Sequence, residues 1–275
     1  KLADHTKAKL VNEDARRYKE FLKNYSKTSG KTLYSSKLRE VHDSNFVISV
    51  GSYLKSDLPN ARYAFNNSVI MNKGAGLYFH PIADPVMEKI GKKGKTTEFI
   101  YHDALVEESI LYFILYKFAK DLPADIKSYI DSFTQTRTKT LTEVVKENVV
   151  EIVVDEETGE EKEVKKVVSK NISTEVSYEY TSLVADFGKD ENFLDLLNDM
   201  LAKKDTFSLM VGEDLITHPN SENLAKLCGL IDRCTDFNVV IIPTQTNTLG
   251  VSQICTLSDE VDGFSVGYNV KADFE

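Results

Sequence analysis

Short apolar runs alternate with longer amphipathic segments along most of this chain. The first runs are rich in apolar and β-branched side chains and predict buried strands at residues 46–50, 75–80 and 96–101. The segments that follow have helical spacing and predict helices at about 58–71, 86–90 and 103–120. This β-α-β-α-β-α order predicts an α/β fold, in which a parallel sheet carries helices on both faces.

The same alternation returns near the end of the chain, and an amphipathic segment precedes the first strand. The additional elements that we expect are helices at 11–25, 190–202 and 220–234, strands at 207–211 and 238–242, and an extended segment at 261–270. We therefore divide the chain into a first α/β half, 1–120, and a second α/β half, 189–275.

Residues 121–188 have a different character and are interpreted as an insertion between the two halves. Two β-branched runs within 150–168 flank the turn-forming cluster Asp155-Glu-Glu-Thr-Gly159, a pattern that predicts a β-hairpin. Its alternating charges favour solvated strand faces. We expect the hairpin to protrude and either to pack on a neighbouring subunit or to remain mobile.

Composition narrows the possible partners. The 275 residues carry a formal net charge of −9, which argues against nucleic acid because phosphates are bound by Lys and Arg patches. The longest apolar run, 110–116, is too short to cross a bilayer, so no direct membrane insertion is expected. The first residues show neither an initiator Met nor a signal-peptide pattern, and we expect a piece of a longer polypeptide.

The three cysteines do not predict a metal or cluster site. Cys228 and Cys234 are six residues apart on an expected helix, so they do not share a face, and Cys255 lies elsewhere. Structural zinc and iron–sulfur clusters usually need four ligands in tighter groups. We interpret all three as buried thiols in a reducing compartment and expect no metal ligand in this chain.

Several candidate residues stand where a strand gives way to a loop. Ligands of open parallel sheets bind at the carboxyl ends of the strands, near the point where the strand order reverses. The candidate crevice residues are Gly51, His80, His102, Asp103, Gly212, Pro243 and Asn247. Every α/β sheet has such an edge, so the pattern by itself does not establish a ligand.

The local motifs favour no intrinsic chemistry. The loop 51–57 is neither Gly-x-Gly-x-x-Gly nor a Walker loop, and its bulky Tyr53 and Leu54 would keep a pyrophosphate from the backbone. No Ser or Cys nucleophile stands at a recognisable elbow beside His102 and Asp103, and we interpret Asp103 as a helix N-cap. The pairs Glu107-Glu108 and Glu156-Glu157 are interpreted as exposed faces, so no catalytic residue is assigned.

Three stretches together resemble one family. The first is Phe46-Val-Ile-Ser-Val-Gly-Ser-Tyr-Leu-Lys-Ser-Asp-Leu-Pro-Asn-Ala-Arg62, continued by Asn66-Asn-Ser-Val-Ile-Met-Asn-Lys-Gly-Ala-Gly-Leu-Tyr-Phe-His-Pro81. The second is Leu209-Met-Val-Gly-Glu-Asp-Leu-Ile-Thr-His-Pro-Asn-Ser-Glu-Asn-Leu-Ala-Lys-Leu227, and the third is Ile241-Ile-Pro-Thr-Gln-Thr-Asn-Thr-Leu-Gly250. They resemble the molybdopterin-oxidoreductase-like region in the family of large iron–sulfur subunits of NADH-quinone oxidoreductase, respiratory complex I. The resemblance covers about 44–120 and 190–259.

The resemblance implies a fold, a setting and partners. It implies α/β domains like those of formate dehydrogenase and dimethyl-sulfoxide reductase. It implies membership of the peripheral arm of a membrane-bound complex at the cytoplasmic face of a bacterial inner membrane, with the other peripheral-arm subunits as partners. The iron–sulfur clusters of the parent subunit would lie outside this chain, which would hold no cofactor of its own.

One departure from the pterin-binding relatives decides how the resemblance is interpreted. Those relatives carry a Pro-Gly-Thr-Asp-type loop after the third strand, whereas this chain has Ile100-Tyr-His-Asp103. Bulky residues replace small ones, and no molybdenum ligand can be assigned. We therefore expect a non-catalytic scaffold region of an NADH-quinone oxidoreductase. The alternatives are part of a molybdopterin-dependent, formate dehydrogenase-like oxidoreductase and a free-standing ligand-binding module.

Overall fold

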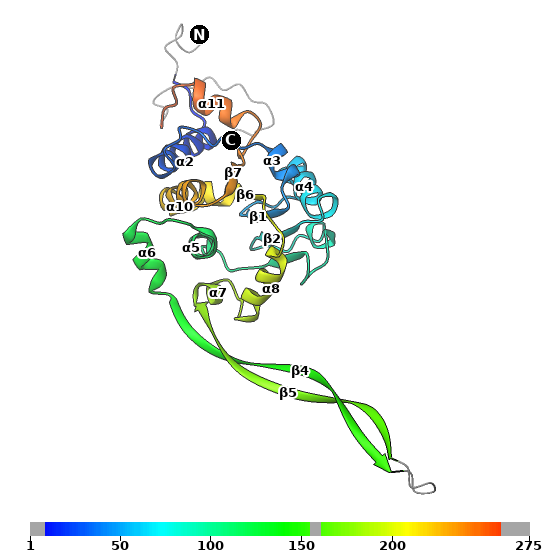
Figure 1. The fold of residues 1–275 in the computed structure, drawn as a ribbon. Helices are drawn as coiled ribbons and strands as arrows, with labels where there is room; N and C mark the ends of the chain where they lie inside the picture. Colours follow the sequence, from blue (N-terminus) through cyan, green and yellow to red (C-terminus); the bar gives the residue numbers. More distant parts are fainter. Residues whose placement is uncertain (1–8, 155–160, 260–275) are drawn as a thin grey trace. The chain divides into compact units, whose positions relative to one another are not determined.

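The computed structural model describes residues 9–154 and 161–259 (Figure 1). The chain forms two compact units: one is built from the segments before Phe133 and after Thr181, and the other is Phe133–Thr181. The first is called the α/β unit and the second the hairpin unit. Among the described residues, no helix is both long and apolar enough to cross a membrane.

A five-stranded parallel sheet forms the centre of the α/β unit. Its strands are β1 (Phe46–Val50), β2 (Ala75–Phe79), β3 (Thr97–Ile100), β6 (Phe207–Val211) and β7 (Phe237–Ile241). The order across the sheet is β3-β2-β1-β6-β7, and β1 pairs in parallel with both β2 and β6. The expected α/β class with a parallel sheet is thus confirmed, and β6 and β7 extend the sheet that the first three strands begin.

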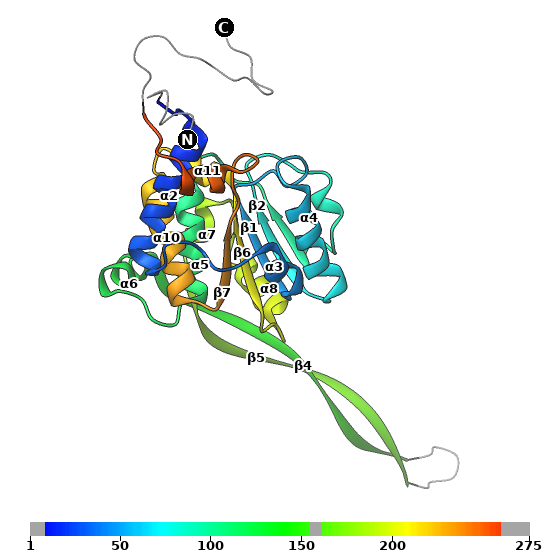
Figure 2. The ribbon, with the colours of Figure 1, turned by 90° about the horizontal axis from the view of Figure 1, so that it is seen from above.

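Helices cover both faces of this sheet (Figure 2). On one face, α3 (Leu38–Asp43), α4 (Pro59–Asn66) and the π-helical turn η1 (Asn67–Met71) enclose a core with alternate strand residues. Helices α2 (Glu13–Ser29), α5 (Glu107–Phe118) and α10 (Ser221–Cys234) lie on the opposite face. Strands that are buried on both faces need continuous apolar runs, which explains why the strand signal in the sequence was strong.

Capping residues explain several of the observed helix ends. The Asn12 side chain accepts a hydrogen bond from the Ala15 N–H at 2.8 Å and begins α2, and Gly30, with φ +74°, ends it. Pro59 occupies the first turn of α4, where its missing N–H is not needed. Asn220 precedes α10.

The cap expected at Asp103 is wrong. Helix α5 begins at Glu107, preceded by Val106, and Asp103 lies in an irregular segment with Leu105 in the left-handed region at φ +71°. The structure also contains short helices that the pattern did not predict, because a few residues carry too little periodicity. Besides α3, they are α6 (Ala124–Asp131), α7 (Leu183–Asp186), α9 (Glu213–Thr217) and α11 (Thr248–Ile254).

The other elements among the described residues of the α/β unit are the 3₁₀ turn η2 (Met87–Lys89) and helix α8 (Asn192–Leu201). Helices α6 and α7 fall within the expected insertion, 121–188, yet they belong to the α/β unit. The extended segment expected at 261–270 lies outside the described residues.

The hairpin unit consists of β4 (Thr134–Val154) and β5 (Glu161–Thr181), which pair antiparallel. The expected hairpin strands thus lie within longer strands, and the expected turn lies in residues that the structure does not describe. The Arg137 guanidinium lies 3.7 Å from the ring centroid of Tyr180, and the Lys139 ammonium lies 5.1 Å from that of Tyr178. These diagonal cross-strand contacts stabilise a ribbon whose two faces alternate along each strand.

Deletion of the hairpin unit is expected to leave the α/β unit folded. Thr134 and Thr181 stand opposite each other, so a linker of two or three Gly or Ser residues can replace residues 133–181. The five strands and their covering helices all lie in the remaining segments. Thermal unfolding followed by circular dichroism should remain a single cooperative transition, and a broad, non-cooperative transition would contradict this expectation.

Candidate functional site

The strand order places the candidate crevice at β1 and β6. The chain moves from β1 towards β3 in one direction and later adds β6 and β7 in the other, so the order reverses between these two strands. Gly51 follows β1 and Gly212 follows β6, and both therefore lie at the position where such sheets bind their ligands.

The two glycines are in direct contact, which closes the gap between the loops that follow β1 and β6. A Cβ atom on Gly212 would lie 1.9 Å from the Gly51 carbonyl oxygen, and one on Gly51, at φ +69°, would lie 2.3 Å from Leu215 Cδ1. The Gly212 N–H donates to the Val50 carbonyl at 2.8 Å, and the Asp214 N–H donates to the Gly51 carbonyl at 3.0 Å. Backbone and a buried Leu215 thus occupy the switch point.

Carboxylates of the chain itself bind the amides of the loop after β1. The Tyr53 N–H donates to Asp57 Oδ2 at 2.6 Å, and the Lys55 N–H donates to Asp84 Oδ2 at 3.1 Å. Asp84 is fully buried and also accepts from the N–H groups of Val86 and Met87. A phosphate-binding loop directs such amides at its ligand. Here internal carboxylates accept the hydrogen bonds of these two amides.

The surrounding charge also disfavours an anionic ligand. Glu213 and Asp214 begin α9, next to the loop that carries Asp57. Burial, followed by the negative charges of Asp57 and Asp214, raises the pKa of Glu213 above its ordinary value. Because these carboxylates already repel each other, a phosphate or pyrophosphate at this edge would add to the repulsion.

His80 bridges the ends of β2 and β6. Its ring is nearly buried, and Nε2 lies 3.4 Å from Asp214 Oδ2. Nδ1 lies 3.0 Å from both the N–H and the carbonyl oxygen of Ile82. In the neutral ring Nδ1 accepts from the Ile82 N–H, and in the charged ring Nδ1–H donates to the Ile82 carbonyl. Both protonation states therefore have a partner at this nitrogen.

The charged form of His80 is favoured in the folded protein. Burial alone lowers the pKa of His80, but the hydrogen bonds to Asp214 and to the Ile82 carbonyl, with the negative charge of Asp214, outweigh burial. The pKa of His80 is therefore raised above its ordinary value. A raised folded-state pKa adds stability that is fully present below the unfolded pKa and is lost as the pH rises through the folded pKa.

Asp214→Asn is therefore expected to destabilise the α/β unit more at about pH 5.5 than at about pH 8.5, on either side of the ordinary histidine pKa. The difference should stay below about 1 kcal/mol, because the Asp214 side chain is 38% exposed and solvent screens the pair. Urea unfolding at both pH values measures it. The exposed Asp199→Asn is the control, and an equal loss for Asp214→Asn at both pH values would contradict the assignment.

The other candidates lie around this centre. His102 is buried after β3, where its Nδ1–H donates to the Asp103 carbonyl at 2.8 Å, and Asp103 itself is exposed. Asn247 is exposed after β7, in the left-handed region at φ +64°, and precedes α11. The structure thus brings Gly51, His80 and Gly212 together through Asp214. Within residues 9–154 and 161–259, no hydrogen bond or ion pair joins the other candidates to this group.

Glu107 and His218 form a buried pair that the sequence did not predict. Glu107 Oε2 lies 3.6 Å from His218 Nε2, and both side chains are more than nine-tenths buried. His218 Nδ1 accepts from the Asn220 N–H at 2.9 Å, which leaves the proton on Nε2, facing the carboxylate. The prediction that Glu107 is exposed is therefore wrong. The neighbouring Glu108 accepts hydrogen bonds from the side chains of Asn220 and Asn223. Glu107 and Glu108 together therefore connect the start of α5 to the start of α10.

No protein-family model matches this chain, and no curated protein matches it. The assignment of chemistry therefore depends on the geometry of the residues themselves.

The described residues contain no group of three or more His, Cys, Asp and Glu side chains that could hold a metal ion. Cys228 and Cys234 are buried on α10, and burial raises the pKa of the Cys228 thiol, which disfavours a thiolate ligand. The interpretation of Cys255 as a buried thiol is wrong, because its side chain is half-exposed.

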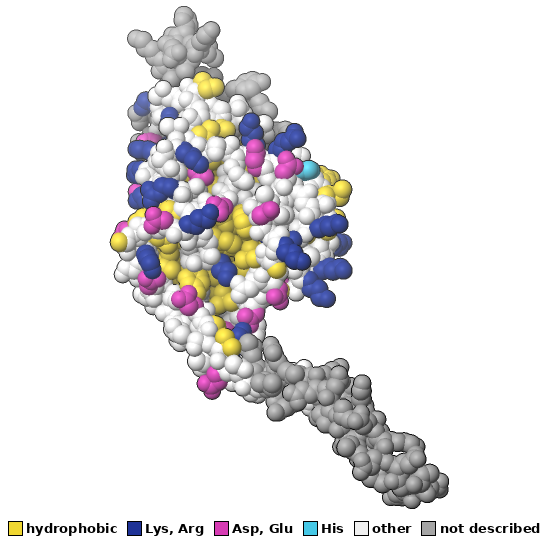
Figure 3. All heavy atoms as spheres, viewed as in Figure 1, with side chains coloured by type: hydrophobic (Ala, Val, Ile, Leu, Met, Phe, Trp, Pro, Cys, Tyr) yellow, Lys and Arg dark blue, Asp and Glu magenta, His cyan; other side chains and the backbone are white. Residues whose placement is uncertain are grey.

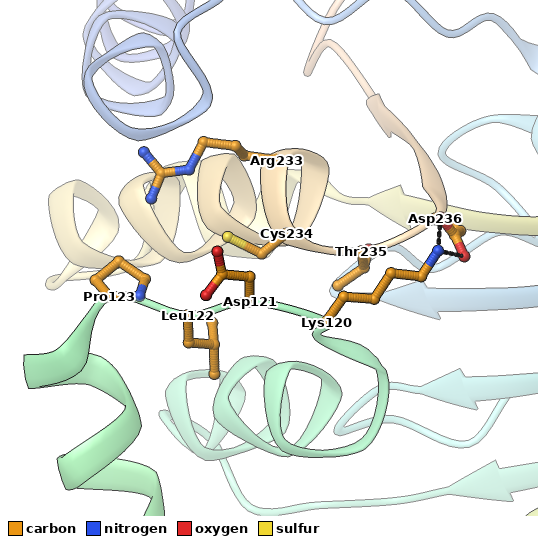
Figure 4. A pocket seen from close by; sticks show the side chains of 8 residues that line it. All are labelled: Lys120, Asp121, Leu122, Pro123, Arg233, Cys234, Thr235 and Asp236. Atoms are coloured by element: carbon orange, nitrogen blue, oxygen red, sulfur yellow. Dashed lines mark hydrogen bonds and ion pairs between the residues drawn. The ribbon is translucent and has the colours of Figure 1, made fainter.

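A cavity of about 520 Å³ lies near the amino end of β7, where α10 ends, and not at the carboxyl ends of the strands where the candidate crevice lies (Figure 4). It lies between the loop after α5, which includes Lys120 and Asp121, and residues Arg233 and Cys234. Lys120 is bound to Asp236 at 2.6 Å. None of the candidate crevice residues lines this cavity, so the site predicted from the sequence and the cavity lie in different parts of the α/β unit.

Proposed function

We propose that this chain is a non-catalytic scaffold region of the large electron-transfer subunit of a respiratory NADH-quinone oxidoreductase. It would stabilise the peripheral arm of that complex at the cytoplasmic face of a bacterial inner membrane and dock neighbouring subunits. The redox centres, including the iron–sulfur clusters, would lie in other parts of the assembly. On this proposal, the fold is of the formate dehydrogenase and dimethyl-sulfoxide reductase type.

The internal occupation of the loop after β1 carries the non-catalytic part of the proposal. Tyr53 and Lys55 direct their amides at Asp57 and Asp84, and Gly212 lies against Gly51. A cofactor-binding relative would leave these amides and this gap to its ligand. A protein can therefore keep this fold as a rigid scaffold when its own carboxylates and backbone occupy the position of a former ligand site.

The family part of the proposal depends on three stretches that meet in space. The first stretch forms β1, α4 and β2, the second runs from β6 into α10, and the third follows from β7 to α11. All three contribute loops to one edge of the sheet. Three stretches that resemble the same family in the same order, and whose loops lie at the same ends of the strands, support the proposal more than any one of them alone.

The residues do not fit a pterin or a cluster. Bulky Tyr101 and His102 replace the small residues of a pterin-phosphate loop, and the switch point is closed by backbone contact. The three cysteines do not converge, since Cys228 and Cys234 lie in the buried part of α10 and Cys255 follows α11.

Native gels of detergent-solubilised membranes test the proposal. An antibody against this chain should detect a large membrane complex, and an NADH-dye activity stain should colour the same band. A small soluble species would contradict the proposal. A large complex without NADH activity that contains molybdenum and pterin in proportion to this chain would replace it with the formate dehydrogenase-like alternative.

A further inference from the structure

A short segment before the edge strand β3 carries an unusual concentration of positive charge. Lys89, Lys92, Lys93 and Lys95 fall within seven residues of an otherwise acidic chain. All four side chains are exposed, and none forms an ion pair or side-chain hydrogen bond with any residue in 9–154 or 161–259. Their charges are therefore directed at solvent or at a partner.

The backbone holds this segment in one conformation. Gly91 and Gly94 adopt left-handed angles of φ +75° and +72°, which permit a tight loop. The Thr96 and Thr97 N–H groups both donate to the Lys92 carbonyl, and the Lys92 N–H donates to Thr96 Oγ1 at 2.8 Å. The lysines thus project from an ordered loop, which reduces the entropy that would be lost on binding.

Two further lysines and an apolar rim belong to the same edge. The Gly76 N–H donates to the Thr96 carbonyl at 2.8 Å, which places the start of β2 beside the loop. Lys73 lies just before β2, and Lys204 Nζ donates to its carbonyl at 2.7 Å. Met71, two residues earlier, is 70% exposed. Figure 3 shows Lys and Arg side chains gathered on the side of the molecule where Figure 1 places the loop between β2 and β3.

We propose that this basic edge, defined as Lys73, Lys89, Lys92, Lys93, Lys95 and Lys204 with Met71, is a docking surface for an acidic protein surface. The partner is a neighbouring subunit that presents several carboxylates around an apolar side chain. Unpaired lysines on a fixed loop gain attraction when they meet carboxylates, and Met71 supplies apolar area that is removed from water. The choice of a neighbouring subunit rests on the proposed scaffold function.

The charge of the whole chain favours a protein over a nucleic acid or a bilayer. The net charge is −9, so the remaining surface is acidic and repels extended polyanions. A nucleic acid or an anionic membrane presents charge over a wide area and would meet that surface as well. A protein can present a small acidic patch that matches the basic edge alone.

The test compares two triple variants of the full-length subunit in its native complex. Lys92→Gln, Lys93→Gln and Lys95→Gln remove three charges from the basic edge. The control, Lys19→Gln, Lys23→Gln and Lys55→Gln, removes three exposed and unpaired charges from α2 and from the loop after β1. Purified membranes are extracted with mild detergent, and native gels measure how much subunit stays in the complex as NaCl rises to about 0.5 M, where charge pairs are strongly screened.

The basic-edge variant should leave the complex at lower salt than the wild type, with a severalfold smaller retained fraction at the wild-type midpoint, and the control variant should match the wild type. Equal retention of all three would overturn the inference. The inference would also be overturned if the basic-edge variant stayed in the complex as well as the wild type does, but its complex no longer floated with phosphatidylglycerol vesicles. That result would assign the basic edge to a membrane. If the wild-type complex lacks NADH activity, the proposed function fails. The comparison of the variants still shows whether the basic edge is a docking surface.

Discussion

Gly212→Ala is expected to destabilise the α/β unit by about 3 kcal/mol or more, near the upper end of the usual cost of overpacking. The backbone of Gly212 is in an extended conformation, with φ −91° and ψ −179°, which alanine also adopts. The cost therefore comes from space alone. The added Cβ would lie 1.9 Å from the Gly51 carbonyl oxygen and 2.5 Å from Ser52 Cβ.

The obstructing oxygen cannot move aside without breaking other contacts. The Gly51 carbonyl accepts from the Asp214 N–H, and the Gly51 N–H donates to the Phe79 carbonyl at 3.2 Å. A shift of Gly51 would disturb both neighbouring strands. Urea unfolding of the full chain, followed by tyrosine fluorescence and circular dichroism, measures the loss.

Gly188→Ala is the matched control. Gly188 has a left-handed φ of +72°, yet a Cβ there would meet nothing within 4 Å. Its cost should be about 1 kcal/mol, the usual penalty for a left-handed alanine. If Gly212→Ala costs no more than Gly188→Ala, then the loops after β1 and β6 are separable, and the closed switch point that supports the scaffold proposal must be abandoned.

Phe187→Ala is expected to cost about 4 kcal/mol, as is usual for removing a buried ring without refilling its cavity. Phe187 is 1% exposed and lies between α7 and α8. Its ring centroid is 5.3 Å from that of Phe113 on α5, 5.5 Å from that of Phe79 on β2 and 5.8 Å from that of Phe193 on α8. The side chain thus joins the segment after the hairpin to the first strands.

Two further variants test the cause of this loss. Phe187→Leu keeps most of the apolar volume and should cost less than about 2 kcal/mol. Tyr63→Ala removes a ring that is 58% exposed and should change stability by less than about 0.5 kcal/mol. Urea midpoints rank the three variants, and hydrogen exchange of α8 should rise in Phe187→Ala alone. A loss no greater than that of Tyr63→Ala would show that α7 and α8 are not anchored by this ring.

The position of Phe187 also explains why the expected limits of the insertion, 121 and 188, differ from the limits of the hairpin unit. The segments 121–132 and 182–188 contain neither a strand-length apolar run nor a long helical period, so no pattern in the sequence assigns them to the α/β unit. Four of their apolar side chains, those of Ile130, Leu183, Val184 and Phe187, are nonetheless almost fully buried. Burial of so few side chains in such short segments leaves no periodic signal in a sequence.

In the candidate site, too, the sequence showed features that depend on neighbouring residues but not contacts between distant ones. The sequence located Gly51, His80 and Gly212 at strand ends. A buried strand requires a run of apolar residues, and the residue at which that run stops can be identified from the sequence. It did not locate the partners of those residues. Asp214 lies 134 positions after His80, and His218 lies 111 positions after Glu107. The strand order brings the first pair together, and the packing of α5 against α10 brings the second pair together.

The sequence by itself determined the α/β class, the places of the five strands and the long helices, and a hairpin between β-branched runs. These features follow from periodicity and capping, which act over a few residues. The tertiary structure alone decided that β6 lies beside β1, that Gly212 closes on Gly51, that Asp57 and Asp84 take the loop amides, and that Lys73 joins the lysines before β3. Each of these depends on contacts between segments that are distant along the chain, and no local pattern records such contacts.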